Sequence, residues 1–327
     1  MSMIEINHLV KKYGQNFAVN DISFSVNEGE VLGFLGPNGA GKTTTMNILT
    51  GYLSATGGSA KIAGIDILEN PMEAKKHIGF LPEHPPLYQD MTVKEYLNFV
   101  YNLKKCTLNR KAHLGEICEV IRIEDVYKRP ISHLSKGYRQ RVGIAQALIG
   151  NPDVLIFDEP TVGLDPKQII EIRNLITGLG KKHTIILSSH ILPEVQSVCG
   201  RIVIINKGKI VADAKTDELD VLTGSRKLVA KITGKPQETV NLLSSIPGVT
   251  ACEQLPERDG DAYAFLLESQ NDVDIRKMLF TKVASNGRFL VGLEPVGANL
   301  EDVFITLTGA PSDTAPDSQS TEGGKTE

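Results

Sequence analysis

The 327-residue sequence predicts an α/β domain followed by a smaller α+β unit. In the first part of the chain, short apolar runs that suit buried parallel strands alternate with helical patterns. One of these runs passes through a glycine-rich segment into a helix, within residues 31–50. Beyond residue 227 the pattern changes to strands with alternating polar and apolar residues, separated by two helices.

The composition is that of an ordinary globular protein. Hydrophobic residues make up 41%, charged residues 23%, and the net charge is -4. The lysine pairs at 104–105 and 181–182 are too short to form a basic stripe, so we expect no nucleic-acid partner. The four cysteines include no closely spaced pair, which argues against a zinc site or a disulfide framework and favours a reducing cytosol. No stretch approaches the roughly 18 apolar residues that cross a bilayer, and the N-terminus lacks a signal-peptide core, so we expect any membrane role to come through a partner.

Two stretches near the N-terminus, 3–9 and 22–26, alternate apolar and polar residues and predict antiparallel strands. Tyr13 lies between them on an expected turn, where its ring could stack on an adenine base. Taken alone, Tyr13 fits a half-buried packing residue better. Its importance depends on the glycine-rich segment that follows.

The glycine-rich segment has the spacing of a phosphate-binding P-loop. Val31–Leu35 precedes it as a buried strand, and a helix from Thr44 to Thr50 follows and is stopped by Gly51. The glycines let the backbone aim N–H groups at a polyphosphate, next to the positive end of a helix dipole. Lys42 would reach the β- and γ-phosphates, and the Thr43 hydroxyl would hold Mg²⁺. The alternative is a glycine-rich turn without a ligand. The predicted nucleotide-binding residues here are Gly36, Pro37, Asn38, Gly39, Ala40, Gly41, Lys42, Thr43 and Thr44.

The chain then passes from strands into a helical region. Residues 57–67 predict a hairpin, and the apolar strand 78–83 ends in Glu83, where several prolines require an irregular loop. From about 90 to 150, helical spacing of apolar residues predicts a helical subdomain inserted into the sheet domain. Within it, the Ser135 hydroxyl and the Gly137 N–H begin a helix and could bind an anion. As an isolated motif this is an ordinary serine N-cap.

Two later strands also end in polar side chains. Val154–Phe157 is followed by Asp158 and Glu159, and the strand 184–189 is followed by His190. Ligands bind at the carboxyl edge of open α/β sheets, so Asp158 suits a Mg²⁺ shell and Glu159 suits the polarisation of an attacking water. His190 would contact the γ-phosphate. The alternatives are an exposed acidic pair and a histidine that is simply a satisfied polar residue.

Together these residues resemble the nucleotide-binding subunit of an ATP-binding cassette (ABC) transporter. The resemblance implies a P-loop NTPase fold with a mixed sheet core, an antiparallel β subdomain and the inserted helical subdomain. It also implies ATP and Mg²⁺ as cofactors, with Glu159 as the general base and His190 positioning the γ-phosphate. The match runs from about residue 3 to 220 and includes, in family order, the phosphate loop, a signature-like segment at 134–138, the magnesium strand 154–159, the nucleotide-binding loop of Asp165, and His190.

The resemblance further implies a dimer. In this family two cassettes associate head to tail, so each ATP lies between the phosphate loop of one and the signature segment of the other. Ser135 and Gly137 would therefore act in trans, on the ATP of a second copy or of a paralogous cassette. ATP closes the dimer and hydrolysis opens it, which drives a polytopic membrane permease. We therefore expect a peripheral protein at the cytoplasmic face of the cell membrane.

Three positions depart from the family pattern. The usual glutamine after the strand is Glu83, while Lys136 and Tyr138 replace the common glycine and glutamine of the signature. Glu83 could still approach Mg²⁺ or its water and joins Thr43 and Asp158 in the expected metal set, but it adds a negative charge near the triphosphate. Residues 134–141 nevertheless resemble the branch that drives ABC-2-type exporters.

The leading interpretation is therefore an ATPase that dimerises and powers export through a separate ABC-2-type permease. The alternative is a soluble regulatory or nucleic-acid-associated ABC ATPase without a permease. A P-loop kinase is a third possibility, but it would not explain residues 134–138 or His190.

Residues 223–309 are expected to form an accessory domain after the cassette of residues 1–222. The element order βαββαβ predicts a small ferredoxin-like sandwich, and its closing stretch, 300–308, is similar to the end of the extension found in that exporter branch. It carries no catalytic constellation, so dimer contact, regulation and passive packing all remain open. Residues 310–327 contain no large apolar side chain and predict a disordered tail.

Overall fold

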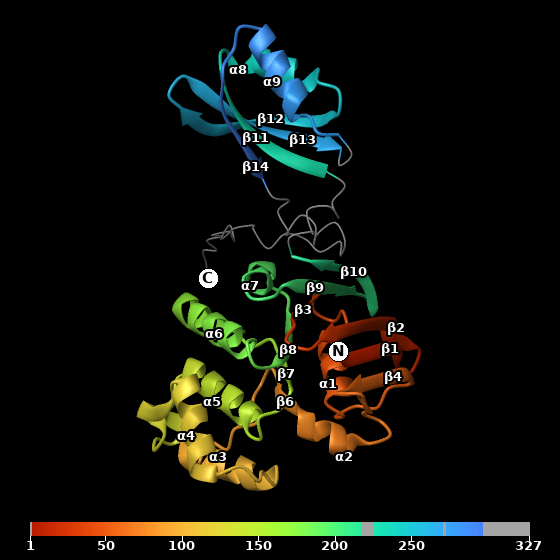
Figure 1. The fold of residues 1–327 in the computed structure, drawn as a ribbon, viewed down its shortest axis with the longest axis vertical. Coiled ribbons are helices and arrows are strands. Elements are labelled where there is room, and N and C mark those ends of the chain that lie inside the picture. The colour runs from red at the N-terminus through yellow and green to blue at the C-terminus, as the bar shows by residue number, and fades with distance from the viewer. Residues whose placement is uncertain (1, 217–224, 271–272, 297–327) are drawn as a thin grey trace, which may run out of the picture. The chain divides into compact units, whose positions relative to one another are not determined.

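The computed structural model describes residues 2–216, 225–270 and 273–296. Contacts between Cα atoms divide the chain into two compact units, residues 1–219 and 220–327 (Figure 1). The predicted boundary after residue 222 lies outside the described residues, as do the closing stretch 300–308 and the tail 310–327. These three stay predictions.

The first unit is built on two sheets. Its strands are β1 Ser2–Tyr13, β2 Asn16–Asn27, β3 Val31–Leu35, β4 Gly57–Ile62, β5 Ile65–Asp66, β6 Ile78–Leu81, β7 Val154–Asp158, β8 Thr184–Ser189, β9 Arg201–Asn206 and β10 Lys209–Lys215. One sheet is antiparallel with the order β2-β1-β4-β5, and the other has the order β10-β9-β3-β8-β7-β6. All neighbours in the larger sheet are parallel except β9 and β10. The predicted mixed sheet and antiparallel subdomain are thus confirmed.

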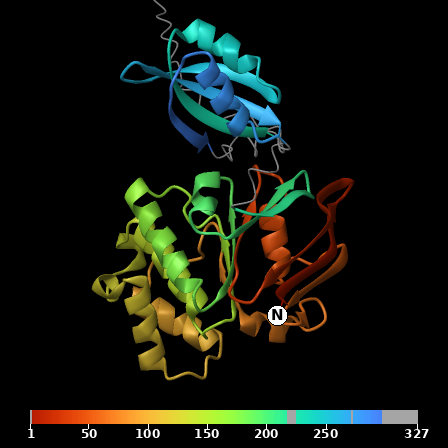
Figure 2. The same cartoon turned by 45° about the horizontal axis from the view of Figure 1, so that its top comes forward.

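Helices cover the larger sheet and form the insert between β6 and β7. The helices are α1 Lys42–Leu49, α2 Pro71–Ala74, α3 Val93–Leu103, α4 Arg110–Ile121, α5 Lys136–Leu148, α6 Pro166–Leu179 and α7 Leu192–Gln196. Figures 1 and 2 show α5 and α6 on one side of the larger sheet and the antiparallel sheet on the other. The insert begins at a capping box, in which the Glu95 N–H donates to Thr92 Oγ1 and the Thr92 N–H donates to the Glu95 carboxylate. No helix in the described part of the chain is long and apolar enough to span a bilayer.

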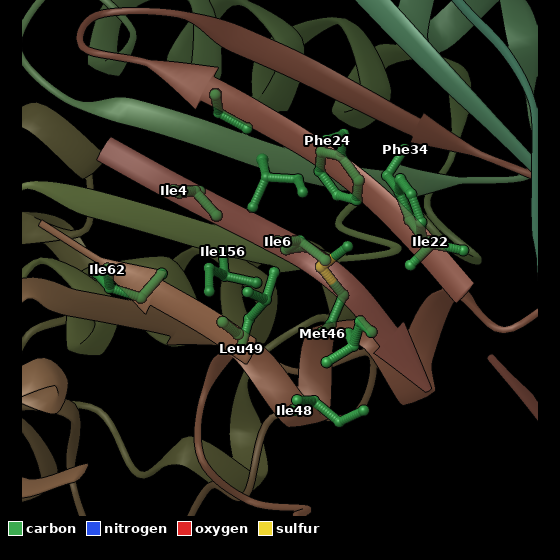
Figure 3. Packing of buried hydrophobic residues seen from close by; sticks show 14 of the residues in the cluster. Ile4, Ile6, Ile22, Phe24, Phe34, Met46, Ile48, Leu49, Ile62 and Ile156 are labelled. Carbon is green, nitrogen blue, oxygen red and sulfur yellow. The ribbon is translucent and has the colours of Figure 1, made fainter. Parts of the chain in front are cut away.

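A hydrophobic core joins the two sheets to α1. Figure 3 shows Ile6 of β1 beside Met46 and Leu49 of α1, and Ile4 of β1 belongs to the same cluster. The rings of Phe24 and Phe34, from β2 and β3, stack with centroids 5.4 Å apart. Burying these side chains stabilises the unit by about 1.5–3 kcal/mol for each. Because β3 and α1 are both anchored in this core, the loop between them is held at both ends.

The strand register brings the functional edge together. Phe34 of β3 pairs with Ser188 of β8, and Asp158 of β7 pairs with the same serine from the other side. Leu35 of β3 pairs with Ser189. The residues that follow β3, β7 and β8 therefore emerge side by side, as expected for neighbouring parallel strands.

Several predicted boundaries were wrong. Tyr13 is the last residue of β1 rather than part of a turn, because the register of β1 against β2 shifts between Ile6 and Leu9 and again before Lys11, which interrupts the alternation. The helix after the phosphate loop begins at Lys42, and β6 ends at Leu81. Strands β9 and β10 and the short helix α7 were not predicted.

The described residues of the second unit form a four-stranded antiparallel sheet with two helices. Its elements are β11 Ser225–Thr233, α8 Pro236–Ser244, β12 Val249–Asp259, β13 Ala262–Gln270, α9 Arg276–Ser285 and β14 Leu290–Val296. The sheet order is β12-β13-β11-β14. Its core contains Ile232, Leu243, Phe265 and Leu279, from strands and both helices. The assignment of this unit to the ferredoxin-like fold stays a prediction.

Candidate functional site

The phosphate loop lies between β3 and α1, and its backbone requires glycine. Gly39 and Gly41 have φ angles of +78° and +113°, which residues with a Cβ rarely adopt. A Cβ on Gly36 would lie 2.4 Å from the carbonyl oxygen of Ile205, and one on Gly41 would lie 2.4 Å from that of Ala18. Strands β9 and β2 therefore press against the loop and fix its path.

Lys42 places a positive charge inside this loop. It is 5% exposed, and its Nζ donates hydrogen bonds to the carbonyl oxygens of Gly36 at 2.7 Å and Pro37 at 3.3 Å. The same Nζ lies 3.4 Å from Glu159 Oε1. An anion at the start of α1 would meet this ammonium together with the N–H groups of the first helical turn.

Asp158 is buried at the end of β7 and is held by hydroxyl groups. Ser188 Oγ donates to Asp158 Oδ1 at 2.5 Å and accepts a hydrogen bond from the Glu159 N–H at 3.0 Å. Burial raises the pKa of Asp158, while hydrogen bonds from Ser188 and Thr43 act in the opposite direction. Asp158 is therefore a buried carboxyl group that accepts hydrogen bonds from two hydroxyl groups, one of which belongs to Thr43 at the phosphate loop.

Glu159 connects the phosphate loop to the end of β8. It is 6% exposed, and its carboxylate lies between Lys42 Nζ, 3.4 Å from Oε1, and His190 Nδ1, 2.9 Å from Oε2. Its φ angle of +48° is unusual for a residue other than glycine. Such backbone outliers persist where the surroundings enforce them and are frequent at functional sites.

A cavity of about 320 Å³ lies beside these groups. A larger cavity, of about 830 Å³, lies between α4 and α6 and is lined by none of the predicted site residues. The predicted residues Gly36, Pro37, Ala40 and Asp158 are outside the lining of the smaller cavity. That cavity is lined by Ala18, Asn38, Gly39, Gly41, Lys42, Thr43, Thr44, Glu83, Glu159, Val162 and His190.

The signature-like residues form a second group, away from this cavity. Ser135 is the N-cap of α5, and its hydroxyl accepts a hydrogen bond from the Tyr138 N–H at 3.4 Å. Asp165 is the N-cap of α6, and its carboxylate accepts from the Gln168 N–H at 2.9 Å. A Cβ on Gly137 would lie 2.6 Å from the Gln168 side chain, so the N-terminal turns of α5 and α6 are in contact. The cavity is lined by none of these three residues, Ser135, Gly137 and Asp165.

The two remaining predicted residues, Glu83 and Tyr13, differ in whether they line the cavity. Glu83 lines the cavity, and its Oε1 lies 4.0 Å from His84 Nδ1. Tyr13 is 50% exposed and does not line the cavity, and the ammonium of Lys11 lies 5.2 Å from the centre of its ring.

Sequence reasoning missed four residues that support the site from behind. Ser188 bonds to Asp158 and to the backbone of Glu159, as described above. The other three are buried polar residues: Thr161 belongs to the segment after Glu159, and Gln140 and Glu194 bond to that segment. A signal existed for Ser188, because two serines end the apolar run of β8.

Comparison with known proteins gives consistent matches. A family model described as "ABC transporter" matches residues 19–162. The chain is similar to the bacitracin transport ATP-binding protein BcrA of Bacillus licheniformis, with 38% identity over 220 residues, 67% of this chain and 71% of that protein. It is 37% identical over 309 residues to the uncharacterized ABC transporter ATP-binding protein YxlF of Bacillus subtilis, covering 94% of this chain and all (100%) of that one. It is 32% identical over 315 residues to the Nod factor export ATP-binding protein I of Cupriavidus pinatubonensis, covering 94% of this chain and 91% of that one.

The chain is also similar in fold to solved structures of ATP-binding cassettes. The dimeric post-hydrolysis structure of the ATP-binding cassette MJ0796, bound to ADP and Pi, matches with a TM-score of 0.60 and 25% sequence identity. The match covers 65% of this chain and 99% of that chain.

Replacing Ser188 by alanine tests how Asp158 is held. Without the Ser188 hydroxyl, the ionised form of Asp158 loses a donor, so its pKa should rise further above the ordinary value. The free energy of unfolding at neutral pH should fall by about 1–3 kcal/mol, the usual loss when a buried charged group loses a hydrogen bond. Because protonation removes the charge that needed the donor, the difference from wild type should shrink as the pH falls through the folded-state pKa of Asp158.

Urea unfolding at a series of pH values measures this difference. Ser25→Ala, an exposed serine on β2, is the matched control and should change stability little. A loss of stability in Ser188→Ala that is constant with pH would contradict the assigned role of the hydroxyl.

Proposed function

The chain belongs to the ABC transporter family of ATP-binding proteins, and on that premise we propose that it is the ATPase subunit of an ABC-2-type exporter. The observation that carries this proposal is the single carboxylate of Glu159, held between Lys42 and His190 at the phosphate loop. Likeness to transport and export proteins over most of the chain supports the coupling to a permease. Residues 134–141 support the ABC-2-type branch.

Hydrolysis would proceed by attack of water on the γ-phosphate. Lys42, freed from the carbonyl groups of Gly36 and Pro37 by a stronger acceptor, would bind the β- and γ-phosphate oxygens. Glu159 would take the proton of the attacking water, and ADP would leave with the bridging oxygen. His190, which bonds to Glu159, would orient that carboxylate and contact the γ-phosphate.

The residues at this site fit Mg²⁺. In the described part of the chain no group of three or more His, Cys, Asp or Glu side chains could hold a metal by itself. Mg²⁺ in nucleotide sites is typically held by one or two protein oxygens together with phosphates, which agrees with that finding. The Thr43 hydroxyl and the Asp158 carboxylate would hold the ion, with Glu83 facing it or its water. When bound, Mg²⁺ supplies neutralisation of charge on the phosphate oxygens.

We infer a head-to-tail dimer from the two separate groups of predicted residues. Ser135, Gly137 and Asp165 lie outside the cavity of their own chain, although the N-terminal ends of α5 and α6 suit an anion. A second copy, or a paralogous cassette, would bring this group to the phosphates held by the first. The likeness to the dimeric cassette MJ0796 supports this arrangement.

An exposed aromatic patch, formed by Tyr88 and Phe99 in the chain after Glu83, supports the proposed permease contact. Tyr88 is 53% exposed and Phe99 is 36% exposed, and their rings meet edge to face at 5.3 Å. Exposed apolar surface of this kind is typical of protein contact sites. Cytoplasmic loops of the permease would bind here, which would hold the subunit at the cytoplasmic face of the membrane.

Lys42→Ala should weaken ATP binding by at least about tenfold, because the ammonium that neutralises the phosphates is lost. Isothermal titration calorimetry with ATP measures this directly. Lys76→Ala removes an exposed lysine paired with Glu73 and should bind ATP like wild type. Tight binding by Lys42→Ala would show that the phosphate loop has been assigned incorrectly.

Glu159→Gln should keep ATP binding and lose turnover by about 100-fold or more, since the amide cannot accept the proton of water. Trapped ATP should hold the two cassettes together. Phosphate release and size-exclusion chromatography with Mg²⁺ and ATP measure the two effects. A variant that is monomeric with ATP, or that turns over at the wild-type rate, would contradict the dimer or the general base respectively.

Pull-down of the tagged chain from detergent-solubilised membranes should recover a polytopic membrane protein of the ABC-2 type. Phe99→Asp should reduce that recovery because it places a charge in the aromatic patch, whereas Phe17→Asp, at an exposed phenylalanine of β2, should not. Absence of any polytopic protein would favour a regulatory ATPase without a permease. Equal loss in both variants would instead contradict the aromatic patch as the contact site.

A further inference from the structure

A buried polar network lies behind the segment that joins Glu159 to α6. Thr161 and Glu194 are each 5% exposed, and the Thr161 hydroxyl donates a hydrogen bond to Glu194 Oε2. Glu194 Oε1 lies 3.7 Å from Nη2 of Arg173 on α6. None of the three residues lines the nucleotide cavity, so the network makes no predicted contact with ATP.

The same segment is held from its other side by the inserted helical region. Gln140 of α5 is buried, and its Nε2 donates to the carbonyl oxygen of Pro160 at 2.9 Å. Pro160 and Thr161 follow Glu159 directly along the chain. The two residues after the proposed general base are therefore fixed by side chains from α5 and α7.

Chain connectivity links this network to His190. Glu194 lies on α7, about one helical turn after His190. His190 itself bonds to Glu159 at 2.9 Å. The Thr161–Glu194 contact is thus a second connection between the segment that carries Glu159 and the segment that carries His190. A shift of one segment would be transmitted to the other at both points.

The stability of the fold does not by itself explain why these polar residues are buried here. Glu194 is a buried carboxylate whose one ion-pair partner lies at 3.7 Å, and within the described part of the chain Arg173 Nε is buried without a hydrogen-bond partner. The attraction within a buried ion pair often fails to offset the desolvation of its charges, so apolar residues of similar size would pack at least as well. What the network provides is a fixed position for Thr161.

We propose that Glu194 and Thr161 are positioning residues for ATP hydrolysis. They hold the segment after Glu159 against α7, so that Glu159 and His190 keep the geometry in which both face the γ-phosphate. This inference rests on the proposed function, in which Glu159 takes the proton of the attacking water. Misplacement of a catalytic group by about 1 Å can cost 100-fold in rate.

The test is a double-mutant cycle in the full-length chain. Thr161→Val removes the hydroxyl and keeps the shape, while Glu194→Met keeps the length of the side chain and removes the carboxylate that accepts the hydrogen bond. Each should lower kcat by about 10- to 100-fold and leave KM and the Kd for ATP within about twofold, because the cavity lining is unchanged. The double variant should be no slower than the slower single variant, since both disturb one contact. Thr161→Ser, which restores the hydroxyl, should recover most of the wild-type kcat.

Thr177→Val is the matched control, because Thr177 on α6 also donates its hydroxyl, in this case to the carbonyl oxygen of Arg173, but is exposed. Thermal melting without nucleotide verifies that each variant is folded. Any of four results would overturn the positioning role. They are a wild-type kcat in Thr161→Val, no recovery of kcat in Thr161→Ser, additive losses of kcat in the double variant, and a loss of ATP affinity parallel to the loss of kcat. Glu159→Gln distinguishes failure of the proposed function from failure of this inference. If Glu159→Gln keeps wild-type turnover, the proposed mechanism fails. If Glu159→Gln is inactive and the Thr161 and Glu194 variants are not impaired, only the role of Thr161 and Glu194 fails.

Discussion

A carboxylate removed from water needs partners, and the site depends on how Glu159 obtains them. One of its oxygens faces Lys42 at 3.4 Å and the other faces His190 at 2.9 Å. One partner follows β3 through the phosphate loop and the other follows β8 directly, so the arrangement exists only if β3, β7 and β8 are neighbours and end at the same level. The sheet order β3-β8-β7 and its register provide this.

The hydrophobic core explains why that edge is rigid. Phe34 of β3 and Ile156 of β7 are completely buried, and Met46 and Leu49 anchor α1 to the same core. Close-packed interiors permit little movement of the strands they hold. The phosphate loop and the acids after β7 are therefore fixed relative to each other before any nucleotide binds, which lowers the cost of ordering them on binding.

The fold class and the central residues could be predicted because their signals are local. A glycine-rich turn between a strand and a helix, or two acids after an apolar run, can be recognised without knowing which strands are adjacent. Thr161 and Glu194 could not be found this way, because their importance depends on α7 folding back against the segment after Glu159. Ser188 has a local signal at the end of β8, but its role depends on β8 lying between β3 and β7. For Tyr13 the local pattern was misleading. The irregular pairing between β1 and β2 interrupts the alternation of polar and apolar residues, so the end of β1 was predicted too early and the turn was misplaced.

The distribution of buried charge separates the two units. Among the described residues, the buried Lys, Asp and Glu side chains are Lys42, Asp158, Glu159 and Glu194, all in the first unit. The buried polar side chains described in the second unit, Thr239 and Ser269, carry no charge. Burial of charge lowers the stability of the fold unless each charged group is paired. The buried charges are concentrated at one sheet edge and on the helix behind it, which indicates that the exact position of these side chains matters more there than close packing. Glu194 belongs to that group although it does not reach the cavity, and for this reason the chemistry of the site extends beyond the residues that line it.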